Sequence, residues 1–330
     1  MRRREFLTLL GAAASSALCA TAVRAQPPAK LRRIGVLSQG SAAEHPSHLF
    51  QEFLSGLSEL GWVEGHNLAV EWRFSEGSFD PLPRLAAELV SIPVDLIVAS
   101  PAAPAAAAKA ATSSIPVVFI QVPDPVQLGI VASLARPGGN VTGFSSIASD
   151  LTGKRLALVK EALPQAQRLA MLWNRPSQGA ALVSREMLRV QGQVGLELTD
   201  LGVASRSELP AAFAAAERAR VAALMVIDDP TMVSYRDTVV QLAAEHALPI
   251  FSQYSEYVDS GGLMAYGPSL RALYRRGAIY VDRIFKGAKP NDLPVEQPAV
   301  FELVINLKAA KAFGVELAPT VVARADRVIE

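Results

Sequence analysis

Short apolar strands alternate with helical patterns along almost the whole chain. Residues 33–37 form an apolar run, and Leu49, Phe53 and Leu57 then recur at the three- to four-residue spacing of a helix. Residues 68–74 alternate apolar and polar positions, which is typical of a strand with one polar face. The pattern continues with a helix over 82–90, a strand over 94–99, an Ala-rich helix and a strand over 115–120. This βαβαβαβ order predicts a parallel sheet with helical crossovers.

The rhythm weakens at residues 136–140, which include a Pro-Gly-Gly turn, and then starts again. Helices are expected over 152–163, 177–193, 207–220 and 231–247, each followed by a strand, over 168–173, 196–201, 221–227 and 249–252. We therefore expect two similar α/β lobes rather than one large sheet.

The last part of the chain is too small to form a third lobe. It contains a short strand over 261–266, a helix over 269–286 and a strand over 301–306. These elements must dock onto the two lobes already formed, so the chain is expected to cross between the lobes more than once. Such a chain makes a hinged clamshell.

The first 25 residues have the pattern of a cleavable export signal. Arg2, Arg3 and Arg4 precede an uncharged apolar run over 6–23, and small residues at Val23 and Ala25 end it. Arg3 and Arg4, followed by Glu-Phe-Leu, also fit the twin-arginine pattern. The run is at the lower length limit of a spanning helix, so a retained membrane anchor is the alternative. We expect cleavage near Ala25 and a periplasmic product; the twin-arginine and general export routes both stay open.

Cleavage would change the chemistry that the chain can carry out. The only cysteine, Cys19, lies within the signal, so the mature chain would hold no disulfide, thiolate nucleophile or cysteine metal site. Removal of four arginines and one glutamate leaves 28 basic and 30 acidic residues. This balance does not favour nucleic acid as a partner. We expect a monomer that requires no cofactor.

The motifs expected of an enzyme are missing. No glycine-rich nucleotide fingerprint follows the first strand, no Gly-x-Ser-x-Gly elbow is present, and residues 152–155 match a phosphate loop only superficially. His45 and His48 are a possible metal pair, but Pro46 lies between them in a loop, where solvent or cleft lining is favoured. We therefore predict no catalytic residue and no metal site.

Ligands of open α/β sheets bind beyond the carboxyl ends of the strands. The loops at those ends combine polar residues from both halves of the chain. The candidate ligand-binding residues are Ser38, Gln39, Ser100, Pro101, Ala102, Asp124, Asn174, Asp228, Asp229 and Tyr254.

The chemistry of these loops favours a zwitterion. The helix that begins after Ser100 would present unpaired amides to a carboxylate, and Asp124, Asp228 or Asp229 would hold an ammonium group. Trp173, Phe251 and Tyr254 would flank an apolar side chain, although Trp173 favours the core. Ser100 and Asp229 each precede a proline as ordinary helix caps do, so capping is an equal alternative.

Several segments together resemble one family. They are the stretches 61–68, 134–143, 261–268, 293–298 and 301–308. The combination, which spans the chain from about residue 32 to 330, resembles the ABC-transporter substrate-binding proteins of the tryptophan/tyrosine-binding type. The chain differs from many of these relatives at 99–102, where Ala-Ser-Pro-Ala replaces Gly-Thr-Pro-Ala.

The resemblance implies a type I periplasmic-binding fold, in which two doubly wound parallel-sheet lobes are joined by a three-segment hinge. Lobe 1 would comprise residues 31–142 with 264–294, and lobe 2 residues 143–263 with 295–330. It also implies a receptor that delivers a small solute, an amino acid or related carboxylate, to the membrane permease of an ABC importer. Two alternatives stay open: an exported sensing module for a signalling receptor, and an exported α/β enzyme.

Overall fold

Two separate sheets organise the computed structural model, which describes residues 31–45 and 47–330. The first sheet has five parallel strands in the order β2-β1-β3-β4-β5. Its strands are β1 Arg32–Ser38, β2 Leu68–Phe74, β3 Leu96–Ser100, β4 Val117–Val122 and β5 Val141–Ser145. Its helices are α1 His48–Glu59, α2 Leu82–Ser91, α3 Ala102–Ala111 and α10 Leu270–Phe285. The expected export signal lies outside the described residues.

The second sheet has seven strands in the order β12-β11-β10-β9-β8-β6-β7, and only β10 and β11 pair antiparallel. Its strands are β6 Arg168–Asn174, β7 Glu197–Val203, β8 Leu224–Val226, β9 Ile250–Ser252, β10 Met264–Pro268, β11 Phe301–Asn306 and β12 Arg327–Ile329. Its helices are α4 Thr152–Ala162, α5 Gln178–Val190, α6 Leu209–Ala219, α7 Pro230–Ser234, α8 Arg236–Glu245, α9 Ser255–Asp259, α11 Leu307–Ala312 and α12 Pro319–Val322. The predicted α/β class with two parallel-dominated sheets is confirmed.

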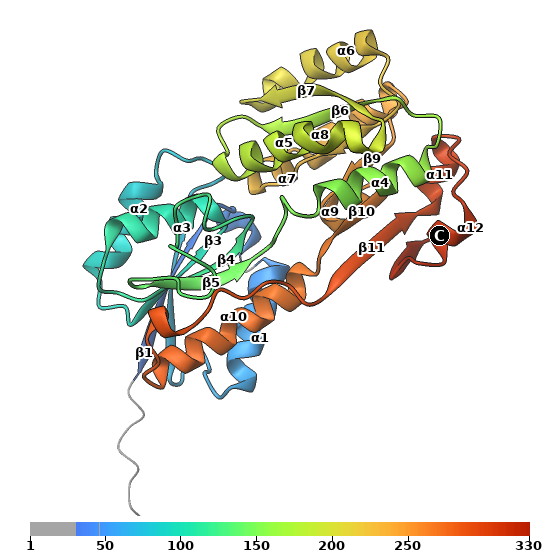
Figure 1. Ribbon diagram of the computed structural model, residues 1–330. Helices are drawn as coiled ribbons and strands as arrows, with labels where there is room; N and C mark the ends of the chain where they lie inside the picture. Colours follow the sequence, from blue (N-terminus) through green and yellow to red (C-terminus); the bar gives the residue numbers. More distant parts are fainter. Residues whose placement is uncertain (1–30, 46) are drawn as a thin grey trace, which may run out of the picture. The chain divides into compact units, whose positions relative to one another are not determined.

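Helices cover both faces of each sheet because the strands are apolar on both faces. In β3, Leu96 and Val98 pack toward α1 and α10, whereas Ile97 and Ala99 pack toward α2 and α3. α10 comes from the C-terminal third of the chain and lies beside α1 (Figure 1). In the second sheet, α4 and α5 cover one face and α6 and α8 the other.

The chain passes between the two sheets three times, and both sheets belong to one compact unit, Arg32–Glu330. The first passage follows β5, the second follows Pro268 at the end of β10, and the third leads from Glu296 into β11. The first and third passages run together, because Ser145 N–H donates to the Glu296 carbonyl at 2.9 Å.

The structure corrects the expected boundaries of the lobes. β10 pairs with β9 and β11, so it belongs to the second sheet and not, as expected for 264–294, to lobe 1. β5, which the sequence reading did not identify, pairs with β4 and extends lobe 1 to Ser145. The helix expected over 231–247 is interrupted at Tyr235, which separates α7 from α8.

Gly56 permits the close packing of α1 on α10. A Cβ atom at this position would lie 2.7 Å from the Arg275 carbonyl oxygen and 3.0 Å from Ala278 Cβ. We expect Gly56→Ala to lower the free energy of unfolding by about 1–2 kcal/mol, because overpacking outweighs the gain in helix propensity. Urea unfolding would measure the change.

Gly153→Ala is the matched control, because this glycine also lies in a helix, α4, and a Cβ there would meet nothing within 4 Å. It should leave stability unchanged or slightly raised. Equal stability of the two variants would contradict the packing argument.

Candidate functional site

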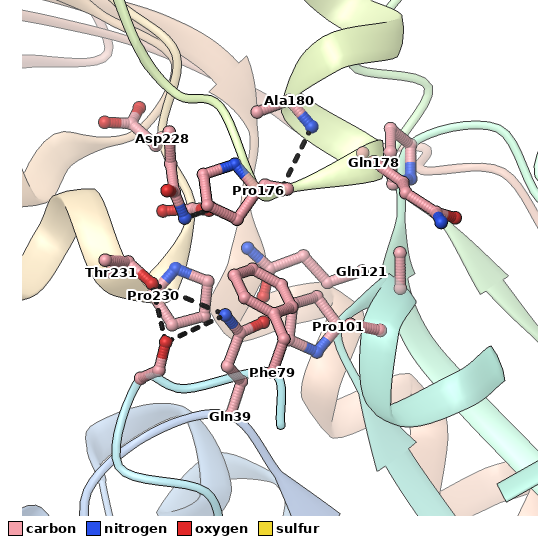
Figure 2. Close-up of a pocket in the computed structure, with 18 of the residues that line it drawn as sticks. Gln39, Phe79, Pro101, Gln121, Pro176, Gln178, Ala180, Asp228, Pro230 and Thr231 are labelled. Carbon is pink, nitrogen blue, oxygen red and sulfur yellow. Dashed lines mark hydrogen bonds between the residues drawn. The ribbon is translucent and has the colours of Figure 1, made fainter. Parts of the chain in front are cut away.

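Loops at the carboxyl ends of the strands of both sheets line a cavity of about 730 Å³. The first sheet contributes residues that follow β1, β3 and β4, and the second contributes residues that follow β6, β8 and β9 (Figure 2). The polar and turn residues involved include Gln39, Pro101, Ala102, Gln121, Pro123, Asn174, Ser177, Asp228, Asp229, Thr231, Gln253 and Tyr254, together with Glu76, Ser78, Asp80, Ser146 and Gln178. The cleft therefore lies where the parallel order of the strands predicts it.

The structure brings nine of the ten candidate residues to this region. Seven line the main cavity: Gln39, Pro101, Ala102, Asn174, Asp228, Asp229 and Tyr254. Ser38 and Ser100 line an adjoining cavity of about 580 Å³. Asp124 lines neither, because its Oδ1 accepts the Val126 and Gln127 N–H groups of a turn at 3.1 and 3.0 Å. A ligand-binding role for the nine residues stays a prediction.

Only one of the two oxygens of the buried Asp228 carboxylate has hydrogen-bond partners. Its Oδ2 accepts the N–H groups of Gln253 and Tyr254 at 2.7 and 2.9 Å, and its Oδ1 is buried without a hydrogen-bond partner. Burial raises the pKa of Asp228 well above its ordinary value, and the nearby Glu256 carboxylate adds to the rise. Asp228 lines the cavity, and its Oδ1 is an acceptor that lacks a donor among the described residues.

Asp229 confirms the capping interpretation instead. Its Oδ1 accepts the Met232 N–H at 2.7 Å at the start of α7, and its Oδ2 accepts Asn174 Nδ2 at 2.7 Å. Both oxygens are engaged, so Asp229 and Asn174 hold each other and shape the wall of the cleft.

Ser100 uses its hydroxyl away from the main cavity. Its Oγ lies 2.6 Å from the Tyr274 hydroxyl, and helix α3 begins without a side-chain cap. The first amides of a helix have no acceptor within the helix, so those of Ala102 and Ala103 point out of its N-terminus beside the cavity. The prediction of an anion site on this loop therefore depends on backbone N–H groups, because the Ser100 hydroxyl contacts Tyr274.

One part of the wall is apolar. Phe79 follows β2, and other apolar residues come from α2, α3 and the loop after β4. These residues are Phe79, Leu82, Ala106, Leu128 and Ile130. Sequence reasoning missed Phe79 because the loop after β2 was left out of the candidate loops, although it too follows the carboxyl end of a strand. Trp173 does not line the cavity; its Nε1 donates to Asp200 Oδ1 at 2.6 Å.

Direct hydrogen bonds join the two lobes across the cleft. Thr231 Oγ1, at the start of α7, donates to the Gly77 carbonyl at 2.9 Å, and Gln39 Nε2 donates to Thr231 Oγ1 at 3.4 Å (Figure 2). These bonds lie where the two cavities adjoin, since Gln39 and Gly77 line both.

His45 and His48 make separate contacts, and no cluster of metal-ligating side chains occurs among the described residues. The His45 ring packs on Trp72 with centroids 4.1 Å apart, and His48 Nε2 lies 3.7 Å from Glu256 Oε1. The lining interpretation is correct for His48, which borders the adjoining cavity.

Comparison with known proteins identifies the family. The model of the ABC transporter substrate binding protein family matches residues 40–329. The chain belongs to this family.

Relatives of this substrate-binding protein extend the comparison. It is 28% identical over 290 residues to the tyrosine-binding protein of Clostridioides difficile. The match covers 87% of this chain and 82% of the relative. A crystal structure from Streptococcus pneumoniae in complex with L-Trp is 27% identical, with a TM-score of 0.83 over 90% of this chain and 99% of that one. A conserved domain protein from Vibrio cholerae gives 26% identity and a TM-score of 0.85, over 91% and 100% of the two chains.

Membership of a solute-binding family confirms that this substrate-binding protein is not an enzyme, and the type I clamshell fold of its relatives agrees with the two-sheet architecture. Within residues 31–45 and 47–330, no helix has the length and apolar character needed to cross a membrane.

The buried Asp228 carboxylate predicts a pH-dependent stability. Because the folded state holds the proton more tightly than the unfolded chain, the free energy of unfolding falls as pH rises from 3.8 through the higher pKa of folded Asp228. Asp228→Asn keeps an oxygen for the two N–H groups and removes the charge. We expect it to raise the melting temperature at pH 7, with the difference vanishing below about pH 3.8.

Asp124→Asn is the control, since Asp124 lies outside both cavities and Asn keeps the acceptor of its turn. Thermal melts of the three proteins between pH 3 and pH 8 would test the prediction. An Asp228→Asn variant that is less stable than the parent at pH 7 would contradict it.

Proposed function

We propose that this substrate-binding protein captures an amino acid with an apolar or aromatic side chain in the cleft and delivers it to the permease of an ABC importer. The observation that carries the proposal is the pairing of opposite polar groups in one cavity. Asp228, which lines the cavity from the second lobe, has an unpartnered acceptor in its buried Oδ1, and the Ala102 and Ala103 amides are donors on the first lobe. A zwitterion has an ammonium group for the acceptor and a carboxylate for the two amide donors.

The rest of the cavity fits a side chain of the same solute. Phe79, Leu82 and Ile130 form an apolar wall, and the volume of about 730 Å³ lies within the range of small-molecule sites. Two relatives support this class of solute, because one is a tyrosine-binding protein and another was crystallised with L-Trp.

Delivery would depend on closure of the lobes. The two sets of polar groups lie on different lobes, so a solute that binds both favours the closed arrangement by its tighter binding to it. The Thr231–Gly77 hydrogen bond between the lobes would add to that preference. The closed surface would then be the form that the permease recognises.

Export to the periplasm is part of the proposal. The basic head, the apolar run and the small residues near Ala25 support a cleaved signal. Mass spectrometry of the protein recovered from the periplasm would give the new N-terminus, and retention of residues 1–25 in the membrane fraction would contradict cleavage.

L-Tryptophan and L-tyrosine should bind the protein and raise its melting temperature with concentration. Asp228→Ala should weaken L-tryptophan binding roughly thirtyfold or more, because it removes the partner of a buried ammonium group. Isothermal titration calorimetry would measure both affinities.

Asp124→Ala, which changes a carboxylate outside both cavities, should bind as the parent does. Tryptamine and indole-3-propionate, which each lack one charge of the zwitterion, should bind more weakly than L-tryptophan. Equal binding of Asp228→Ala and the parent would contradict the ammonium site, and a protein that responds to no amino acid would contradict the solute class.

A further inference from the structure

Gln121 has an unusual backbone conformation beside the cleft. Its φ of 67° lies in the left-handed region that residues other than glycine rarely adopt. It is also the extra residue where the register of β4 against β5 shifts, between Ile120 and Val122. Bulges of this kind re-aim a side chain next to functional sites, and strained residues persist where the surrounding structure holds them. Here the side chain is directed into the cavity (Figure 2).

A buried hydroxyl holds one end of the Gln121 amide. The Tyr274 hydroxyl donates to Gln121 Oε1 at 3.2 Å, and Ser100 Oγ lies 2.6 Å from the same hydroxyl. Since Tyr274 donates its only proton to Gln121, Ser100 must donate to Tyr274. Burial raises the pKa of Tyr274, so the hydroxyl remains a donor at every physiological pH.

The chain of hydrogen bonds from Ser100 through Tyr274 to Gln121, called the relay below, decides which end of the Gln121 amide faces the solute. With Oε1 bound to Tyr274, the Nε2 group, which has two N–H donors, is the end that remains. The side chains of Gln121 and Tyr254 both line the cavity. The N–H groups of Gln121 can therefore donate to an acceptor there.

We propose that Gln121 donates this hydrogen bond to the carboxylate of the solute and that Tyr274 and Ser100 are positioning residues that fix the orientation of its amide. The inference rests on the proposed function. Gln121 lies near the end of β4, next to the strand β3 that leads into α3, so its N–H groups lie on the same lobe as the amides of Ala102 and Ala103. The acidic Asp228 lies on the other lobe, where it would repel a carboxylate.

Gln121→Glu tests the donor with little change of shape. Its carboxylate still accepts from Tyr274 but replaces the N–H donors by a negative oxygen. We expect the affinity for L-tryptophan, measured by calorimetry, to fall roughly tenfold or more, as for loss of a hydrogen bond to a charged group. Binding of tryptamine, which has no carboxylate, should not fall. Gln127→Glu makes the same change at an exposed position outside the cavities and should bind L-tryptophan as the parent does.

A double-mutant cycle tests the positioning role of Tyr274. Tyr274→Phe should weaken L-tryptophan binding in the parent but have no further effect in a Gln121→Ala background, because it acts only through the amide. A structural role of Tyr274 would instead weaken both backgrounds equally. Circular dichroism melts of each variant confirm that it is folded.

The outcomes separate the two proposals. A parent protein that binds neither L-tryptophan nor L-tyrosine overturns the choice of solute, and this inference with it. A parent that binds them while Gln121→Glu binds equally well overturns the role of Gln121 alone. Additive effects in the cycle overturn the relay.

Discussion

The buried guanidinium of Arg155 joins two of the segments that lead from one lobe to the other. Its Nε donates to the Tyr266 carbonyl at 2.8 Å and its Nη1 to the Ala148 carbonyl at 2.6 Å. Ala148 lies in the first passage between the sheets, and Tyr266 lies in β10, just before the second. Burial lowers the pKa of Arg155 to about 10, so the group stays charged at neutral pH. One rigid, multidentate cation thus ties the first passage to the strand that precedes the second.

The charge of Arg155 also belongs to the electrostatics of the cleft. The negative charge of Asp228 favours the guanidinium, and the positive charge of Arg155 opposes the rise in the pKa of Asp228. The two groups nevertheless keep free atoms, since Arg155 Nη2 and Asp228 Oδ1 are both buried without partners, as is Gln253 Nε2. Unsatisfied polar atoms cost stability, and native proteins retain them mainly where function requires it. Asp228 and Gln253 both line the main cavity, so part of this cost falls at the wall of the cleft.

Most of the secondary structure could be predicted from the sequence, because strands buried on both faces are apolar runs and the helices between them keep a regular apolar spacing. β5 was missed because Val141–Ser145 contains Gly143 and follows a turn-rich stretch, which hides the strand pattern. β10 was assigned to the wrong lobe because the residue pattern of a strand does not indicate which strands it pairs with. The candidate site was predicted more unevenly. The charge of Asp124 favoured this residue of the loop after β4, whereas Gln121, three residues earlier and within β4, lines the cavity through a bulge that local sequence does not reveal.

The sequence by itself determined the α/β class, the existence of two lobes, the position of the cleft and the family, because each depends on periodicity, strand order or a shared motif. Only the tertiary structure decided what each polar side chain does. Asp228 and Asp229 are adjacent and chemically identical, yet one caps α7 while the other keeps an oxygen free. Ser100, predicted to bind the ligand or to cap a helix, contacts Tyr274, which lies 174 residues further along the chain. Hydrogen-bond partners so distant in sequence come together only when both sheets and their helices have packed, so no local pattern could have assigned them.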